Sequence, residues 1–389
     1  MIEQIISSFK FDVIEIIALS LLFLFFLIQS FYYLAYYKKP YSYIKDRGGY
    51  NAVLLRLKVS VIIASENEAV ELSENLPLIL EQEYPDFEVI VVNNGSTDES
   101  DVLLSSLNLR YPNLYHTYLP HSGDKKFGRR KLALTLGIKA AKGEVLLFTE
   151  PYSKPISNKW ISSMVAEMRE GKEVVLGYSF FSKVNKFFNR VARFDNHLLS
   201  MQYLSMAIKG KPYTGVYRNV AFKKSLFFDN KGFASYLNLE NGEDVFINQI
   251  VTPENVAVAL CEDSFVETNG ETFTVWKQIK KSYSVAKSYF NSTAPNFFSF
   301  EVFSRYFFYL LFAGLVVYSC IFQLWVLLSI AVFIFLCRYI IQFTALNKPA
   351  KYFHSGKFLL SLVIVDIIQP IYSFRFRSRH QAKKGRGRY

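Results

Sequence analysis

Polar side chains that could do chemistry follow three short apolar runs in this sequence. Ser65 and Glu68 stand at the end of, and just after, the run VSVIIAS. Asn93 and Asn94 follow the run VIVV, and Glu150 follows the run VLLF. If these runs are parallel strands, their carboxyl ends meet at one edge of a sheet, where ligands of such sheets bind. The spacing therefore predicts a single polar crevice built from three strand ends.

A second chemical signal is the acidic pair Glu243 and Asp244 in the stretch NGEDVFINQI. A carboxylate within hydrogen-bond reach of a hydroxyl can take up its proton in a transition state. The same two acids could instead stabilise a helix by lying at its N-terminus. The residues alone leave both interpretations open.

A basic cluster precedes a helical pattern in the middle of the chain, and it comprises Lys125, Lys126, Arg129, Arg130 and Lys131. Ammonium and guanidinium groups bind phosphate oxygens well, so a diphosphate is a natural partner. The alternative is a solvated basic loop, which fits Lys125 and Lys126 best.

The elements that must position these residues alternate between strand and helix from residue 58 to about residue 275. The apolar runs Val59–Ser65 and Phe87–Val92 are typical of strands, and the spacing in Leu72–Gln82 predicts a helix between them. A second helix is predicted before Gly143, followed by a strand. This order indicates an α/β fold with a mostly parallel sheet and crossover helices.

Membrane segments flank this region. The stretch Ile16–Tyr37 contains no charge and is long enough to cross a hydrocarbon core of about 30 Å. Glu3 and Asp12 before it argue against a cleaved signal peptide. Lys38 after it predicts an uncleaved anchor whose end at Lys38 is cytoplasmic.

A second apolar block, Tyr306–Leu346, is too long for one span and predicts a hairpin that turns near Cys320–Gln323. Arg305 before it and Lys348 after it predict that both its ends are cytoplasmic. A third block at 357–375 contains Asp366, Gln369 and Pro370, which are costly in a free lipid-facing span. We expect an interfacial or re-entrant helix there, with a true span as the alternative.

The net charge of +12 is concentrated in part in the basic C-terminal tail, which carries no acid. Because this tail follows an apolar segment, it indicates membrane orientation rather than nucleic-acid binding. The three cysteines have no pair spacing, which argues against a disulfide framework or a zinc site.

Several stretches together resemble membrane-bound family 2 glycosyltransferases, over about residues 58 to 285. VSVIIASENEAVELSENLPLILEQEYPDFEVIVVNNGSTDES resembles the nucleotide-binding start of that family. RRKLALTLGIKAAKGEVLLFTEPYSKP resembles its K-x-x-A-x-x-x-G-I block and the acid-x-acid motif that follows. NGEDVFINQI resembles the motif of the catalytic base, and VWKQIKKSYS stands in the place of Q-x-x-R-W.

The resemblance implies a GT-A fold and inverting transfer of a sugar from a nucleotide-sugar. It implies the base role for Asp244, with Glu243 as the alternative, and a metal role for Glu150 toward Mg²⁺ or Mn²⁺. It also implies two further sets of site residues. The nucleotide would be bound by Ser65, Glu68, Asn93, Asn94 and Lys131, and the diphosphate or acceptor by Gln278, Lys280 and Lys281.

Two motifs depart from the family pattern. Tyr152 stands where the second metal-binding acid is expected, and a neutral phenol is a poor ligand for a hard divalent ion. Lys281 and Ser282 replace the arginine and tryptophan of Q-x-x-R-W. Three hypotheses follow: metal held through Glu150 and the diphosphate, neutralisation by lysines including Lys131, or a catalytically impaired scaffold subunit.

We therefore expect a membrane-bound glycosyltransferase of cell-envelope glycan synthesis. It would use a UDP-sugar and a lipid or lipid-linked saccharide acceptor, and bind no nucleic acid. Its catalytic domain and tail would face the cytoplasm across a bacterial-type inner membrane. The expected parts are an anchor at 1–37, a linker at 38–57, the GT-A domain at 58–275, membrane-interface helices at 276–303, the hairpin at 304–346, the helix at 357–375 and the basic tail at 376–389.

Overall fold

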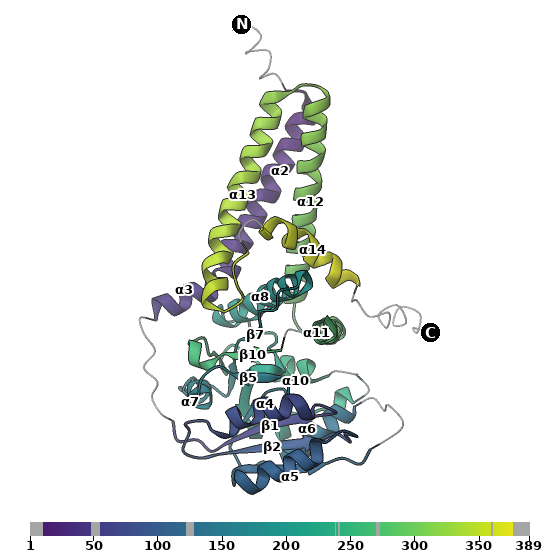
Figure 1. The fold of residues 1–389 in the computed structure, drawn as a ribbon. Coiled ribbons are helices and arrows are strands. Elements are labelled where there is room, and N and C mark those ends of the chain that lie inside the picture. The colour runs from purple at the N-terminus through teal and green to yellow at the C-terminus, as the bar shows by residue number, and fades with distance from the viewer. Residues whose placement is uncertain are drawn as a thin grey trace, which may run out of the picture.

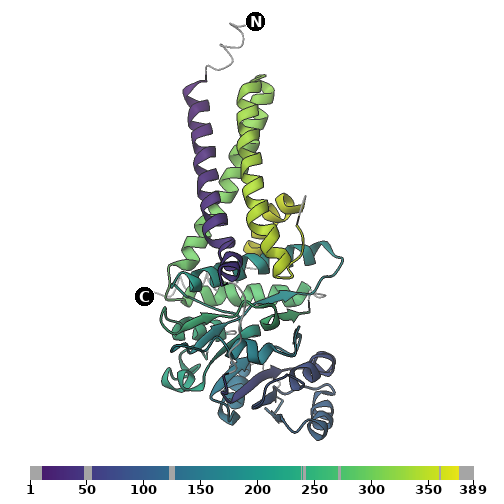
Figure 2. The ribbon, with the colours of Figure 1, turned by 90° about the vertical axis from the view of Figure 1, so that its left-hand side faces the viewer.

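The protein is described by a computed structural model covering residues 11–47, 55–121, 128–237, 239, 242–269, 273–358 and 361–375. The basic tail at 376–389, together with Lys125 and Lys126, lies outside these described residues. Figures 1 and 2 show an α/β domain with three long helices extending from one end of it.

A seven-stranded sheet with the order β3-β2-β1-β4-β8-β6-β9 forms the centre of the domain. Neighbours from β3 to β4 are parallel, β8 is antiparallel to β4 and β6, and β9 is parallel to β6. This confirms the prediction of a mostly parallel α/β sheet. The strands are β1 Val59–Ser65, β2 Phe87–Asn93, β3 Leu114–Tyr118, β4 Val145–Phe148, β6 Val174–Leu176, β8 Val220–Lys223 and β9 Val256–Val258.

Helices cover both faces of this sheet, which is why its central strands are apolar on both sides. Every residue of β1 is buried. Apolar side chains of α4, Ala69–Leu80, pack in the core on one face, and those of α6, Arg129–Ala140, pack in the core on the other. The remaining helices of this part are α5 Ser100–Arg110, α7 Trp160–Val165, α9 Lys224–Asp229 and α10 Glu243–Ile250.

The order in which strands are added to the sheet changes sides at β1. The chain adds β2 and β3 on one side of β1 and then returns to place β4 on the other side. Gly143 makes this return possible, because a Cβ there would lie 2.5 Å from the backbone nitrogen of Ser60. The carboxyl ends of β1 and β4 therefore meet at the point where parallel sheets bind ligands.

A three-stranded sheet lies between the main sheet and the long helices, and it has the order β5-β10-β7. Two helices border it on the side of the long helices, α8 Phe187–Ile208 and α11 Phe273–Ala286. The three strands are β5 Ser153–Pro155, β7 Ser179–Phe181 and β10 Val266–Thr268.

Three helices among the described residues are long and apolar enough to cross a membrane. They are α2 Val13–Tyr32, continued by a π-helical turn at Tyr33–Tyr37, then α12 Ala294–Ile321 and α13 Trp325–Tyr352. The turn between α12 and α13 falls at residues 322–324, close to its predicted position. The helix α12 begins before the expected start at 304, and a short helix, α3 Lys39–Asp46, lies within the expected linker.

The last helix, α14 Leu362–Arg375, lies across the lower part of the three long helices (Figure 1). Its 14 residues measure about 21 Å, shorter than a hydrocarbon core of about 30 Å. Asp366 of α14 forms ion pairs with Arg305 at 2.9 Å and with Arg338 at 3.0 Å. The short length of α14 and the buried ion pairs of Asp366 favour an interfacial or re-entrant helix over a true span.

Candidate active site

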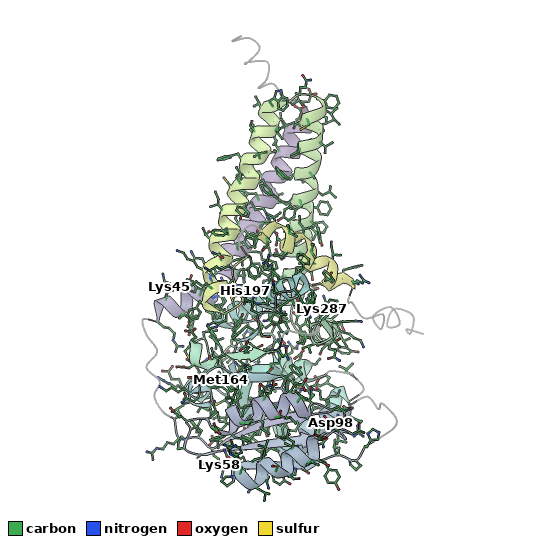
Figure 3. The ribbon with its side chains drawn as sticks, in the orientation of Figure 1. Lys45, Lys58, Asp98, Met164, His197 and Lys287 are labelled. Atoms are coloured by element: carbon green, nitrogen blue, oxygen red, sulfur yellow. The ribbon has the colours of Figure 1, made fainter. Side chains whose placement is uncertain are left out.

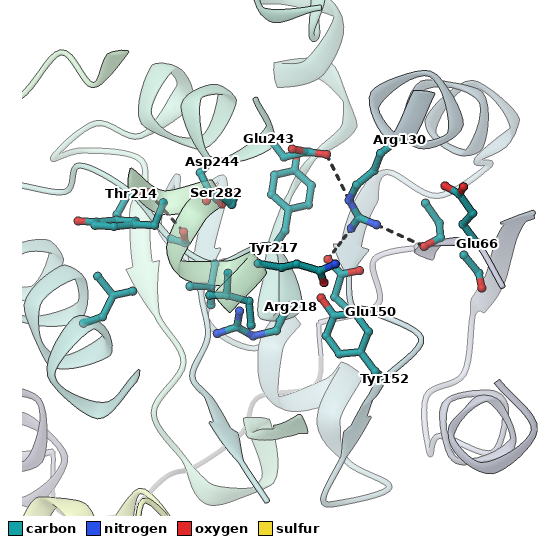
Figure 4. A pocket seen from close by; sticks show the side chains of 18 of the residues that line it. Glu66, Arg130, Glu150, Tyr152, Thr214, Tyr217, Arg218, Glu243, Asp244 and Ser282 are labelled. Carbon is teal, nitrogen blue, oxygen red and sulfur yellow. Dashed lines mark hydrogen bonds and ion pairs between the residues drawn. The ribbon is translucent and has the colours of Figure 1, made fainter. Parts of the chain in front are cut away.

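A cavity of about 340 Å³ opens beyond the carboxyl ends of β1 and β4 (Figure 4). Side chains from the strand ends, from the start of α6, from the segment before β8, and from α8, α10 and α11 surround it. Its charged and amide lining residues are Glu66, Glu68, Asn94, Arg130, Glu150, Arg218, Glu243, Asp244 and Gln278.

The strand-end residues converge as the sequence predicts, with one exception. Ser65, Glu68, Asn94 and Glu150 all line the cavity. Asn93 does not: its side-chain nitrogen donates to Asp101 at 2.7 Å, and its side-chain oxygen accepts from the backbone of the following turn. Asn93 therefore shapes the turn after β2.

Arg130 lies between two acids of the cavity. Its Nη2 is 2.5 Å from Oε1 of Glu150, and its Nε is 3.2 Å from Oε1 of Glu243 (Figure 4). The guanidinium thus joins the end of β4 to the start of α10. The sequence analysis included Arg130 in the basic cluster but gave the nucleotide role to Lys131, although the pattern K-x-x-A, counted back from Ala133, begins at Arg130.

Lys131, the predicted nucleotide ligand, points elsewhere. It is fully buried, does not line the cavity, and its ammonium donates a hydrogen bond to the carbonyl of Leu239. One residue along a helix rotates the side chain by about 100°, which separates it from its neighbour. Arg129 donates to the backbone carbonyls of Asn94 and Pro120.

The acidic pair lies in the first turn of α10, and both residues line the cavity. Burial, and after it the neighbouring Glu243, raises the pKa of Asp244 to about 7. Burial, and after it Glu150, likewise raises the pKa of Glu68 to about 7. Because Glu243 is ion-paired with Arg130, Asp244 is the better placed of the two to accept a proton.

Arg218 is a functional candidate that the sequence analysis did not name. It belongs to the helical turn Tyr217–Asn219 before β8, and it is only 5% exposed. Its Nε donates to Ser179 at 3.2 Å and its Nη2 to Asn196 at 3.0 Å. Both partners are neutral, and no carboxylate among the described residues forms an ion pair with it. No motif in the sequence marks this position.

The residues of the altered Q-x-x-R-W motif divide between two places. Gln278 and Ser282 of α11 line the cavity, whereas Lys281 does not. The ammonium of Lys280 lies 2.8 Å from a carboxylate oxygen of Asp195 on α8. Trp276, in the same helix, is 2% exposed and donates to Asp195 at 3.0 Å, so it packs inside the protein.

A second cavity of about 480 Å³ lies between the domain and the long helices. It is lined by residues of α8, α11, α12 and α14, including Lys280 and Phe374, and by Lys287 of the helical turn Lys287–Tyr289. Lys287 lies at the level where the domain meets the long helices (Figure 3). Leu199 and Tyr283 line both cavities and so separate one from the other.

The residues present do not fit a divalent ion held by the protein. Glu150 is the one acid at the acid-x-acid position, and one of its oxygens is paired with Arg130. Burial raises the pKa of Tyr152 further above its usual range, so its phenol stays neutral. No group of three or more His, Cys, Asp or Glu among the described residues could hold a metal. Hard divalent ions need several oxygen ligands.

Solved structures share this architecture. The mannosyltransferase PcManGT from Pyrobaculum calidifontis, in complex with GDP-Man and Mn²⁺, aligns with a TM-score of 0.58 at 14% identity, covering 91% of this chain and 99% of that one. Residues 1–349 of TarS from S. aureus align with a TM-score of 0.42 at 18% identity, covering 62% and 68%. Their complex with UDP-GlcNAc aligns with a TM-score of 0.40 at 15% identity, covering 84% and 92%. No curated protein sequence matches the chain.

The sheet order, the polar crevice at the switch point and the first of these alignments define a GT-A fold. Residues 60–229 match the model of Glycosyl transferase family 2. The chain therefore carries a family 2 glycosyltransferase domain over these residues.

Proposed function

We propose that this enzyme transfers a sugar, with inversion, to a lipid or lipid-linked saccharide acceptor at the membrane surface. UDP-sugars are the first donors to test, and GDP-Man is the second, since PcManGT was solved with it. The observation that carries the proposal is the second cavity, which adjoins the first at Leu199 and Tyr283.

The second cavity suits an amphipathic acceptor. Lys280 and Lys287 offer positive charge toward a phosphate-bearing head group, and only Asp195 opposes them among the charged lining residues described. Phe374 at its edge is 73% exposed and offers apolar surface to a lipid chain. A head group held here would point its hydroxyl past Tyr283 toward the donor.

The chemistry of inverting transfer requires a base on the acceptor hydroxyl. Asp244 takes the proton while the hydroxyl oxygen attacks the anomeric carbon, and the nucleoside diphosphate leaves with the electrons of the broken bond. Glu150 and Glu243 hold Arg130 at the cavity, where its charge faces the leaving group.

Charge next to the spans supports an orientation with the domain in the cytoplasm. Lys38 and Lys39 follow α2 where it meets the domain, and Lys348 and Lys351 stand at the end of α13 on the same side. Basic residues beside a span normally stay on the cytoplasmic side.

The test is transfer of radiolabel from nucleotide-sugars into organic-solvent-extractable material, using the full chain in vesicles made from the source membranes. Leu199→Trp should block the junction between the cavities, and Lys287→Glu should repel a phosphate-bearing head group. Both variants should lose most lipid labelling while retaining donor binding. Leu109→Trp, at a position 91% exposed on α5, is the matched control. Unchanged labelling in both variants would refute the lipid acceptor route.

A second candidate is a scaffold or binding subunit with impaired catalysis, favoured by Tyr152 in place of an acid and by the pairing of Glu150 with Arg130. This candidate predicts donor binding without transfer to any acceptor in the same vesicles. Transfer that depends on Asp244 would exclude it.

A further inference from the structure

We propose that the guanidinium groups of Arg130 and Arg218, rather than a divalent cation, neutralise the diphosphate of the donor. The inference rests on the proposed function only in placing the diphosphate in the first cavity. Both arginines line that cavity, and they are its only cationic lining residues among those described.

The first argument is that the metal position is already taken. The carboxylate of Glu150, which follows β4 as a metal-binding acid would, has one oxygen 2.5 Å from Arg130. Tyr152 supplies no second carboxylate. An ion entering here would find one unpaired oxygen of Glu150 and a guanidinium next to it, and like charges repel.

The second argument is the buried charge of Arg218. Removing a cation from water is costly unless an anion compensates for it. Its partners Ser179 and Asn196 supply hydrogen bonds but no charge. The charges of Asp244 and Glu150 act on it from nearby without forming an ion pair. Since its side chain lines the cavity, an anionic ligand there would supply a directly paired counter-charge. A planar guanidinium also matches two phosphate oxygens at once.

The third argument concerns exchange of partners at Arg130. Its side chain is 31% exposed, so its outer nitrogen atoms can be reached from the cavity. A diphosphate oxygen can replace the carboxylate of Glu150 or Glu243 as its partner. The displaced carboxylate then lies near a bound anion and gains affinity for a proton.

This exchange gives the arginine site a distinctive pH dependence. Five acids line the cavity, at Glu66, Glu68, Glu150, Glu243 and Asp244. Burial already raises the pKa of Glu68 to about 7. Protonation of Glu68 lowers the repulsion felt by a diphosphate, so donor binding should tighten as pH falls from 8 to 6. Binding through a metal should weaken instead, because its carboxylate ligands must be ionised.

The experiment is calorimetric titration of the full chain in detergent with UDP-GlcNAc and with GDP-Man, in EDTA or in MnCl₂, at pH 6 and pH 8. Intact nucleotide-sugars are used because their diphosphate does not titrate in this range. We expect binding in EDTA, with a Kd within about threefold of that in Mn²⁺, and tighter binding at pH 6. Arg130→Gln and Arg218→Gln should each weaken binding by about tenfold or more, as expected for a lost charge-assisted hydrogen bond.

Three further variants keep the test independent of folding. Arg193→Gln removes a half-buried arginine outside both cavities and should bind the donor like the parent protein. Tyr152→Asp restores the second acid and should gain binding that depends on Mn²⁺, whereas Tyr152→Phe should not.

The outcomes separate this inference from the proposed function. Binding that requires Mn²⁺ in the parent protein would overturn the arginine site and leave the proposed function standing. Binding in EDTA without any lipid labelling would support the arginine site and refute the proposed function. If neither donor binds under any of these conditions, the arginine site is overturned. The proposed function is tested separately by the vesicle assay.

Discussion

The pH dependence of turnover should report the ionisation of Asp244. To act as a base, Asp244 must be ionised. Burial is the main cause that raises the pKa of Asp244 to about 7, and the charge of Glu243 is the next. At saturating donor, kcat should therefore rise with pH through about 7 or slightly above, since a bound diphosphate adds negative charge nearby. Below that midpoint, kcat should fall about tenfold per pH unit, as for any single essential base.

Two substitutions test this assignment. Asp244→Asn should lower kcat by about 10²–10⁴-fold, the usual contribution of a general base, with nearly unchanged donor affinity. Glu243→Gln removes a negative charge that raises the pKa of Asp244, so it should shift the midpoint of the kcat profile to lower pH while retaining turnover. The assay is the initial rate of label transfer between pH 5.5 and 9.

Stability gives an independent readout of the same group. The pKa of Asp244 is higher in the folded state than in the unfolded chain, so the folded protein binds the proton more tightly. Its contribution to stability is therefore present below pH 4 and is lost as pH rises through about 7. Asp244→Asn should raise the thermal midpoint at pH 8 and change it little at pH 4. A flat kcat profile between pH 6 and 8, or an Asn variant with full turnover, would refute the base role.

Two further predictions concern stability. Asp366→Ala leaves the buried guanidinium groups of Arg305 and Arg338 without their shared carboxylate, so it should destabilise the protein in detergent by about 3–5 kcal/mol, and by more than Asp366→Asn. Equal thermal midpoints for the parent and Ala proteins would contradict this. Gly143→Ala places a Cβ 2.5 Å from the backbone nitrogen of Ser60, so it should cost about 1–3 kcal/mol in denaturant unfolding. An unchanged unfolding midpoint would mean that the chain relaxes there without cost.

The local pattern of apolar and polar residues was sufficient to predict several strands and helices. The apolar run of β1 ends at Ser65 in both the prediction and the structure, because a strand buried on both faces requires unbroken apolar residues. The hairpin turn near Gln323 was also predictable, because membrane spans have a length set by the bilayer. The convergence of Ser65, Asn94 and Glu150 followed from the parallel strand order alone.

Tertiary structure decided which charged side chains face the cavity and which are paired elsewhere. Whether Arg130 or Lys131 faces the cavity depends on the rotation of α6 against the sheet, and only the fold sets that rotation. Asp195 pairs with Lys280 from 85 residues away in the sequence, and no local pattern connects two such positions. Arg218 lies in no motif and becomes a candidate only because the fold buries it at the first cavity, where it forms no ion pair with a carboxylate of the described residues. Sequence thus determined which chemical groups the protein carries, and packing between distant segments decided which of them remain available.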